Sequence, residues 1–363
     1  MHFPIQSGAV NALQSPRWVR HTLATASAAL LLVSGTACSS DVIDSTPPTI
    51  PAATPAQSPP VVTAPAGVIR PLAGTPTAAT FDTASAALLV LVPGPRPEDA
   101  ASLVVVPAGG GAPRTMGLPA PATALTTDGA GLAYLSTRGG YLVVEIDSGN
   151  TTRVEVSDEA DTDFTAITRR GDGRIVLGTA DGAVVILADA DAANSPAAVS
   201  HRSKIFARVD SLASKDNTTV VLDRGQTSVT AMDAEGNAAQ SLRAGEGATT
   251  IVVDDAGRVL VTDTRGDELL VFSADPLIMR QRFPVSAAPY GLAGSDGLAW
   301  VSQTASNTVI GYDLSTGIPV EKVRHPTVQQ PNNLGYDADT DTLYVVSGSG
   351  AGVQIIAQAS GTR

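Results

Sequence analysis

The chain of 363 residues is poor in cysteine, in aromatic side chains and in basic residues, and each shortage excludes a class of protein. Its single cysteine rules out an intrachain disulfide framework and a zinc site built from paired cysteines. Acidic residues outnumber basic ones by 35 to 23, which argues against a nucleic-acid partner because such a partner requires a basic surface. Aromatic residues make up only 4% of the chain, so its core must consist largely of small aliphatic side chains.

Motifs of several enzyme classes are also missing. The sequence contains neither an H-E-x-x-H zinc motif nor a G-x-S-x-G nucleophile elbow. The glycine-rich run Gly348 to Gly352 lacks the lysine and the following helix of a phosphate-binding loop. We therefore predict no cofactor, no metal site and no catalytic residue.

Residues 1–37 have the composition of an export signal. They contain no acidic residue, and Arg17 and Arg20 precede an uncharged stretch, Thr22 to Ala37, that is short for a membrane span. Small residues then lead directly to Cys38, the only cysteine. This arrangement resembles the lipobox of bacterial lipoproteins, although Gly35 stands where leucine is usual. The resemblance implies that Cys38 carries a diacylglyceryl group; the alternatives are an ordinary secretory signal and an uncleaved anchor.

The residues after the lipobox have the composition of a spacer. From Ser39 to about Ala66 the sequence is rich in Pro, Thr, Ser and Ala, which favours extended, disordered chain rather than a packed core. Such a spacer of 38–66 would reach about 80 Å in polyproline-II geometry. We expect a protein anchored at the outer face of the cell membrane, whose acidic body is repelled by anionic lipids.

Beyond the spacer, short runs of Val, Leu, Ile and Thr alternate with Gly, Asp and Asn turns in seven repeats. The repeats are 39 to 45 residues apart when measured between the apolar residues of their first strands. Those residues are Phe81, Leu125, Ile167, Leu212, Ile251, Leu292 and Leu334. This period is typical of a β-propeller blade, so residues 67–363 are predicted to form an all-β, seven-bladed β-propeller. A β-helix and a pair of sandwiches are the alternatives.

The two ends of the repeat region predict how the ring closes. The seventh repeat ends after Gln354-Ile355-Ile356 without a fourth strand, whereas Gly67 to Leu72 has no partner within the first repeat. We therefore expect residues 67–72 to form the outer strand of the last blade.

The sixth and seventh repeats resemble a known type of propeller repeat. They are similar to the YVTN/YncE-type repeat. The similar segments are Pro289-Tyr290-Gly291-Leu292, Leu298 to Gln303, Ser306 to Asp313 and Ser315-Thr316-Gly317. The whole chain, including the lipobox and spacer, resembles the LppL-type conserved lipoproteins of mycobacteria. The resemblance is carried by GQTSVT, AWVSQTASNTVIGYDLSTGIPVEKVRHPTVQQP and TLYVVSGSGAGVQ. That resemblance implies an actinobacterial cell-envelope lipoprotein and no established activity.

Propeller ligands usually bind over the central channel, on the face formed by the loops that lead into the first strands and by the turns between second and third strands. Those positions are rich in polar residues that could hold a polar ligand by bidentate bonds. The candidates are Asp163, Arg208, Asp210, Asp223, Arg224, Asp263, Arg265, Tyr290, Gln303, Gln330, Asn332 and Asn333. Alternatively, Asp223/Arg224 and Asp263/Arg265 form ion pairs between blades and shape the turns.

Two active functions and one structural role fit these residues. The first function is a monomeric binding or scaffold module for a polar ligand, a glycan or an envelope protein. The second is a lactonase-like or other hydrolytic enzyme, for which Asp163 and Asp210 with Asn332 or Asn333 are the candidate groups. A purely structural role is the third interpretation. We favour the binding module, with the membrane as a partner through the lipid at Cys38.

Overall fold

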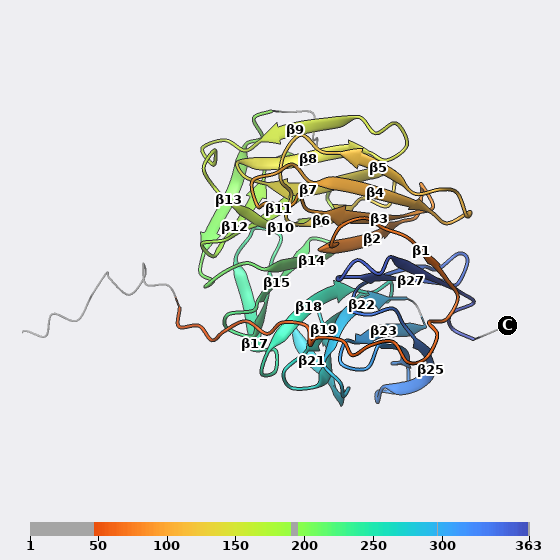
Figure 1. Cartoon of the computed structure of the whole chain (residues 1–363). Coiled ribbons are helices and arrows are strands. Elements are labelled where there is room, and N and C mark those ends of the chain that lie inside the picture. The colour runs from red at the N-terminus through yellow and green to blue at the C-terminus, as the bar shows by residue number, and fades with distance from the viewer. Residues whose placement is uncertain (1–46, 190–194, 296, 362–363) are drawn as a thin grey trace, which may run out of the picture. The chain divides into compact units, whose positions relative to one another are not determined.

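The computed structural model describes residues 47–189, 195–295 and 297–361. The expected signal peptide, Cys38 and the first part of the expected spacer lie outside the described residues. In the part of the chain that is described, the strands form seven four-stranded antiparallel sheets. The first strands of successive sheets contact one another in a closed circuit: β2, β6, β10, β14, β18, β22, β26 and again β2. The protein is therefore a seven-bladed β-propeller (Figure 1).

Six blades are continuous in sequence. Blade 1 consists of β2 (Ala78–Asp82), β3 (Ala87–Val92), β4 (Ser102–Pro107) and β5 (Arg114–Gly117). Blade 2 consists of β6 (Leu125–Thr127), β7 (Leu132–Thr137), β8 (Gly140–Glu145) and β9 (Thr151–Glu155). Blade 3 consists of β10 (Phe164–Arg169), β11 (Ile175–Thr179), β12 (Ala183–Leu187) and β13 (Val199–Lys204). Blade 4 consists of β14 (Ser211–Lys215), β15 (Thr218–Asp223), β16 (Ser228–Met232) and β17 (Ala238–Arg243).

The remaining blades follow the same plan until the last one. Blade 5 consists of β18 (Ala248–Val253), β19 (Arg258–Asp263), β20 (Glu268–Ser273) and β21 (Ile278–Pro284). Blade 6 consists of β22 (Pro289–Gly294), β23 (Leu298–Gln303), β24 (Thr308–Asp313) and β25 (Val320–Pro326). Blade 7 consists of β26 (Pro331–Asp337), β27 (Thr342–Ser347), β28 (Val353–Ala357) and β1 (Val68–Arg70).

The last blade closes the ring as the sequence predicts. Strand β1 pairs antiparallel with β28, with Val68 opposite Ile355 and Arg70 opposite Val353. Gln354 of β28 is fully buried, and its side-chain amide donates to the carbonyls of Ala66 (2.8 Å) and Pro326 (2.9 Å). The closure is therefore held both by strand pairing and by one buried amide.

Strand patterns follow from each strand's place in its blade. The second strands, such as β3 and β11, are buried along their whole length because neighbouring blades cover both faces. The outer strands β13 and β21 alternate between more and less exposed residues, because one face meets solvent. All seven predicted anchor residues, from Phe81 to Leu334, lie on the first strands.

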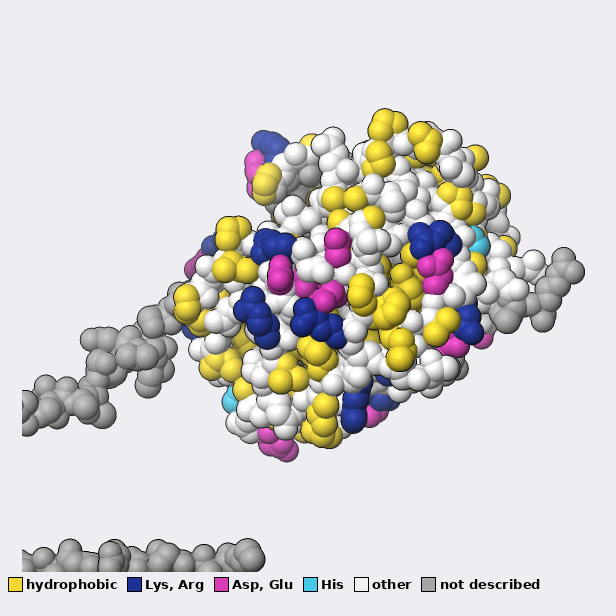
Figure 2. Space-filling view, turned by 90° about the horizontal axis from the view of Figure 1, so that it is seen from below, with side chains coloured by type: hydrophobic (Ala, Val, Ile, Leu, Met, Phe, Trp, Pro, Cys, Tyr) yellow, Lys and Arg dark blue, Asp and Glu magenta, His cyan; other side chains and the backbone are white. Residues whose placement is uncertain are grey.

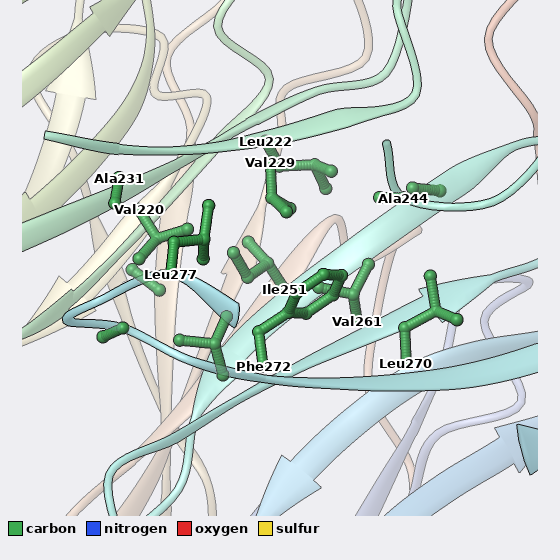
Figure 3. Close-up of a cluster of buried hydrophobic side chains, with 14 residues drawn as sticks. Val220, Leu222, Val229, Ala231, Ala244, Ile251, Val261, Leu270, Phe272 and Leu277 are labelled. Atoms are coloured by element: carbon green, nitrogen blue, oxygen red, sulfur yellow. The ribbon is translucent and has the colours of Figure 1, made fainter. Parts of the chain in front are cut away.

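Small side chains fill the space between blades. Seven hydrophobic clusters are found, each between two neighbouring blades. Figure 3 shows the cluster between blades 4 and 5, where Val220 and Leu222 face Ile251, Val261 and Phe272. The scarcity of aromatic residues fits this packing, because Val, Leu and Ala allow the sheets to approach closely.

Candidate functional site

The first strands of the blades enclose a central channel of about 510 Å³. Its wall is rich in hydroxyl groups, because Thr and Ser recur on these strands. Representative lining residues are Thr80 of β2, Thr126 of β6, Thr168 of β10, Ser211 and Ser214 of β14, and Thr250 of β18. Arg169 at the end of β10 also lines the channel and was not among the predicted residues. Tracing the alternation along each first strand could have identified it.

Five of the twelve predicted residues line this channel and come from three blades. Asp210 and Arg224 belong to blade 4, Tyr290 to blade 6, and Asn332 and Asn333 to blade 7. The structure thus brings together a carboxylate, a guanidinium, a phenol and two amides around one hydroxyl-lined cavity. Such a set offers both donors and acceptors to a polar ligand.

Asp210 is held in place by its neighbours in blade 4. Its carboxylate accepts a hydrogen bond from Nε of Arg208 at 3.0 Å and one from the backbone N–H of Arg224 at 3.1 Å. The Asp210 side chain is 14% exposed, whereas that of Arg208 is 49% exposed. Arg208 therefore acts on the channel through Asp210, since it is not itself part of the lining.

Asp223 and Asp263 take equivalent structural positions at the ends of β15 and β19, and both side chains are fully buried. Asp223 accepts the backbone N–H groups of Ala207 (2.8 Å) and Gln226 (3.0 Å). Asp263 accepts those of Glu246 (2.8 Å), Gly247 (2.7 Å) and Gly266 (3.0 Å). Each carboxylate joins the loop that leads into its blade to the turn after the second strand, which matches the turn-shaping alternative.

Gln303 and Asp163 are also occupied by the protein itself. Gln303 is buried; its amide donates to the carbonyl of Ser286 (2.7 Å), and its Oε1 accepts from Arg324 (3.3 Å). Asp163 forms an exposed ion pair with Arg138 of blade 2 at 3.3 Å. The structure therefore does not bring Asp163 to the channel lining with Asp210.

Residues 47–66, expected to belong to the disordered spacer, lie instead against the ring. We call residues 49–60 the strap. Figure 1 shows this segment in orange, running past β19 and β23 toward β25 and β1. The strap begins where the N–H of Ile50 donates to the carbonyl of Gly225 (2.8 Å), and it belongs to the same compact unit as the ring. The expectation of a free spacer is corrected here, because polar groups on blades 4 to 7 satisfy the strap's backbone.

The two remaining predicted residues, Arg265 and Gln330, bind the strap. Arg265 donates to the carbonyl of Pro51 at 2.8 Å. The side-chain amide of Gln330 donates to the carbonyl of Ala56 at 2.8 Å and also contacts Oδ1 of Asn332 at 3.3 Å. Arg224, a channel residue, donates to the carbonyl of Ala53. Composition could not reveal the strap, because Pro, Ala and Thr favour extended chain whether or not it is docked.

One carboxylate close to the channel has a shifted pKa. Asp82 of β2 is fully buried, which opposes its ionisation, but hydrogen bonds from Thr127 and from the hydroxyl and N–H of Ser85 outweigh that effect. The pKa of Asp82 is therefore lowered. Because Thr127 lines the channel and belongs to blade 2, this carboxylate links two blades at the channel wall.

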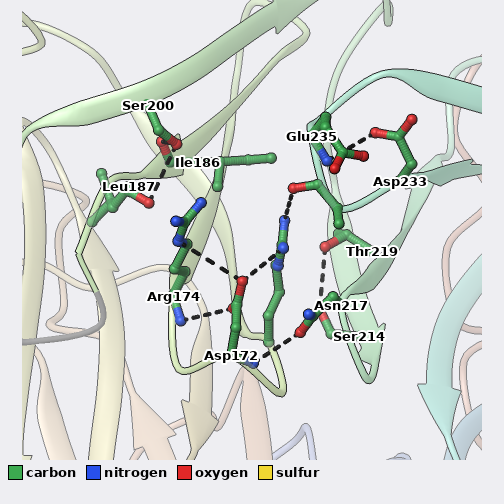
Figure 4. Close-up of polar contacts among 12 residues, drawn as sticks. Asp172, Arg174, Ile186, Leu187, Ser200, Ser214, Asn217, Thr219, Asp233 and Glu235 are labelled. Carbon is green, nitrogen blue, oxygen red and sulfur yellow. Dashed lines mark hydrogen bonds and ion pairs between the residues drawn. The ribbon is translucent and has the colours of Figure 1, made fainter.

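A second polar cluster joins blades 3 and 4 through the turns near residues 170–174, 216–217 and 233–236 (Figure 4). Arg170 is 98% buried, and its guanidinium donates to the carbonyl of Ala234 and to Asp172, both at 2.8 Å. The N–H of Asp172 donates to Oδ1 of Asn217 at 2.9 Å. The contacts of this cluster join the two blades, and the turns at 216–217 and 233–235 also line a pocket of about 600 Å³.

Several charged side chains on the outer strands form ion pairs. Figure 2 shows acidic and basic side chains beside one another on one face of the molecule. Arg282 of β21 pairs with Glu268 of the neighbouring strand β20, and Arg324 pairs with Glu321 within β25, each at 2.7 Å. Exposed pairs of this kind contribute little to stability.

The described residues hold neither a cluster of metal-binding side chains nor a helix that could span a membrane. Residues 47–189, 195–295 and 297–361 contain no group of three or more His, Cys, Asp or Glu side chains placed to hold a metal ion. No helix among them is long and apolar enough to cross a membrane. His325 is used in packing: it stacks on Trp300 with ring centroids 6.3 Å apart, and its Nε2 contacts the carbonyl of Ala359 at 2.8 Å.

Comparison with known proteins supports the fold. No family model matches the chain, and no curated protein matches it. Among solved structures it is similar to a streptogramin B lyase, with 10% identity, a TM-score of 0.62, and coverage of 80% of this chain and 96% of that one. It is also similar to a chain of the mitotic checkpoint complex, with 9% identity, a TM-score of 0.66, and coverage of 84% of this chain and 95% of that one. For Kuenenia stuttgartiensis hydrazine synthase the identity is 13%, the TM-score 0.61, and the coverage 84% of this chain and 99% of that one. At these identities the likeness shows the propeller fold alone.

Proposed function

We propose that the protein is a lipid-anchored module of the bacterial cell envelope and that its channel binds a polar, uncharged ligand such as a short glycan. The observation that carries the proposal is the hydroxyl-lined channel of about 510 Å³, in which Asp210, Arg224, Tyr290, Asn332 and Asn333 meet. This set offers both donors and acceptors, and a tyrosine can pack against a sugar ring. The cavity has the size of known small-molecule sites.

The ligand proposal is tested with a soluble chain that carries Cys38→Ser. Saturation-transfer difference NMR with maltose and chitobiose as probes should show magnetisation transfer to at least one sugar. Asn333→Ala should reduce that transfer, because Asn333 lines the channel. Asn237→Ala, a change in an exposed turn of blade 4, should leave it unchanged. Absence of transfer to both sugars, or equal transfer in the Asn333 variant, would contradict the proposal.

The anchoring proposal rests on the uncharged stretch that ends at Cys38 and on the resemblance to a lipobox. Cells that express the chain are fed an alkyne fatty acid, and the protein is then examined for the label and fractionated. We expect a labelled protein in the membrane fraction, and an unlabelled, released protein for Cys38→Ser. A chain that is released without label while Cys38 is intact would indicate the ordinary secretory signal instead.

Nothing specific in the structure favours the hydrolytic alternative. Each of its candidate carboxylates is paired with an arginine, Asp163 with Arg138 and Asp210 with Arg208, and of the two Asp210 lines the channel. The solved lyases resemble this chain in fold alone, so their activity does not carry over.

A further inference from the structure

The ring satisfies the carbonyl groups of the strap with side-chain donors. An extended, proline-rich segment makes no hydrogen bonds within itself, so its carbonyls need outside partners. Arg265 serves Pro51 at 2.8 Å, Arg224 serves Ala53, and Gln330 serves Ala56 at 2.8 Å. Asn307 and Gln329 both serve Pro59, at 2.8 and 2.9 Å. These donors come from blades 4, 5, 6 and 7 and form one continuous row.

The spacing of the carbonyls matches a polyproline-II helix. Ala53, Ala56 and Pro59 follow one another at intervals of three residues, which is the number of residues per turn of that helix. The carbonyls of Ala53, Ala56 and Pro59 thus lie on one face of the strap, whereas that of Pro51 falls outside this period. A row of donors with this spacing can hydrogen-bond the backbone carbonyls of a polyproline-II segment without using aromatic side chains.

Two positions add sequence specificity. Ser58 makes three hydrogen bonds: its hydroxyl donates to the carbonyl of Thr304 (2.6 Å) and accepts from the N–H of Gln330 (2.8 Å), while its own N–H donates to Oε1 of Gln330 (3.0 Å). Ala53 is 6% exposed, and its Cβ lies so near Gly247 that a Cβ added to that glycine would be only 2.9 Å from it. The groove therefore selects a small residue at the first position and serine at the later one.

The donors are held in conformations that free backbone would rarely adopt. Asn307 and Gln330 have φ angles of 50° and 54°, in the left-handed region that is unfavourable for residues other than glycine. The same left-handed conformation occurs at Thr227 and Asp267, which hold the corresponding turn positions of blades 4 and 5. At Asn307 and Gln330 it places two amide groups toward the strap.

We propose that this row of donors on blades 4 to 7 is a recognition site for extended proline-rich peptides with a small residue five positions before a serine, and that the strap is its resident occupant. The site shares Arg224 with the channel ligand site, its other donors lie outside the channel lining, and it does not depend on lipid attachment. A segment of the same chemistry binds in trans whenever the strap is released. Recognition uses backbone carbonyls for affinity and Ser58 for selection.

The test releases the strap and supplies it again as a peptide. In the full Cys38→Ser chain, Ser58→Asp places a carboxylate against the carbonyl of Thr304 in a buried position, which should free the strap. Hydrogen exchange at Ile50, Ala56 and Ser58, whose N–H groups are bonded to the ring, should become at least about tenfold faster. Ala53→Leu, which collides with Gly247, gives a second released strap.

A fluorescein-labelled peptide of residues 49–61 is then added, and binding is followed by anisotropy. We expect binding to both released chains, little binding to the chain with an intact strap, and none by a peptide that carries Ser58→Asp. Adding Gln330→Ala to the released chains should abolish binding, whereas the matched Gln226→Ala change should preserve it. The proposal is overturned if freely exchanging chains fail to bind the peptide, if Gln330→Ala leaves binding intact, or if the strap amides stay protected in both variants.

Discussion

Asp263 shows how one buried carboxylate organises a propeller turn. It accepts three backbone N–H groups, from Glu246, Gly247 and Gly266, and none of its side-chain surface is exposed. Asp263→Ala would leave these donors without partners. We expect it to lower the free energy of unfolding by about 3 kcal/mol or more, because each buried donor without a partner costs about 1–3 kcal/mol. Urea denaturation measures the change.

The matched control is Asp339→Ala, at an exposed turn of blade 7. Its free energy of unfolding should stay within about 0.5 kcal/mol of the parent chain. If Asp263→Ala were equally mild, the interpretation of Asp263 as the organiser of its turn would be wrong.

Asp82 should make stability depend on pH in the acid range. Because its pKa is lowered in the folded state, its ionised form stabilises the protein above the unfolded value of about 3.9. That contribution is lost as the pH falls through the lower folded pKa. We expect the parent chain to melt above Asp82→Asn at pH 7, and the difference in melting temperature to shrink below about pH 4. A difference that is constant down to pH 2 would exclude this role, and Asp339→Asn provides the comparison.

At this scale, the sequence could predict which positions are polar but not what each side chain contacts. Asp210 and Asp263 both lie at the ends or turns of blade strands, so the repeat pattern makes both of them candidate ligand residues. The structure separates them, because Asp210 lines the channel whereas Asp263 is enclosed by backbone N–H groups. That difference depends on how deeply each side chain is buried, and burial is set by chain segments distant in sequence.

The ring is closed by the pairing of strand β1 with β28, and a single glycine next to β1 allows this pairing to be tested. Gly67, just before β1, has a φ of 71°, and a Cβ there would lie 2.0 Å from the carbonyl oxygen of Ile355 in β28. Gly129 has a φ of 69°, yet a Cβ there would meet no atom within 4 Å. Gly129→Ala should therefore cost only the conformational strain of about 1–2 kcal/mol.

Gly67→Ala combines the same strain with a collision that displaces β1 from β28. We expect its melting temperature to fall well below that of Gly129→Ala in calorimetry. Equal melting temperatures for the two variants would mean that pairing of β1 with β28 contributes little to the ring.

The strands themselves were predictable because their period repeats seven times, and β1 was predictable because the last repeat lacked a strand. The bulges were not. Register shifts occur near the start of β10, β18, β22 and β26, where backbone geometry rather than side-chain type differs. The strap was missed for another reason: its partners are polar side chains on four separate blades, so no local pattern connects Pro51 with Arg265 or Ala56 with Gln330.

For the whole molecule, the strap changes the length of the proposed membrane tether. If Cys38 carries the lipid, Ile50, where the strap joins blade 4, lies only twelve residues further along the chain. A segment of that length spans at most about 40 Å in polyproline-II geometry, compared with about 80 Å for the complete spacer. The strap, and not the composition of the spacer alone, would therefore set how far the ring can move from the membrane surface.

Releasing the strap should then let the anchored ring move outward. In the lipidated chain on vesicles, a donor dye is placed at exposed Ser315 through Ser315→Cys, and acceptor dyes are placed in the lipid. Ser58→Asp should lower the transfer efficiency relative to the parent chain, because the acidic ring is repelled by anionic lipid once its tether is longer. Gln226→Ala should leave the efficiency unchanged. Equal efficiencies in the Ser58→Asp and parent chains, with strap release confirmed by hydrogen exchange, would show that tether length does not determine the position of the ring.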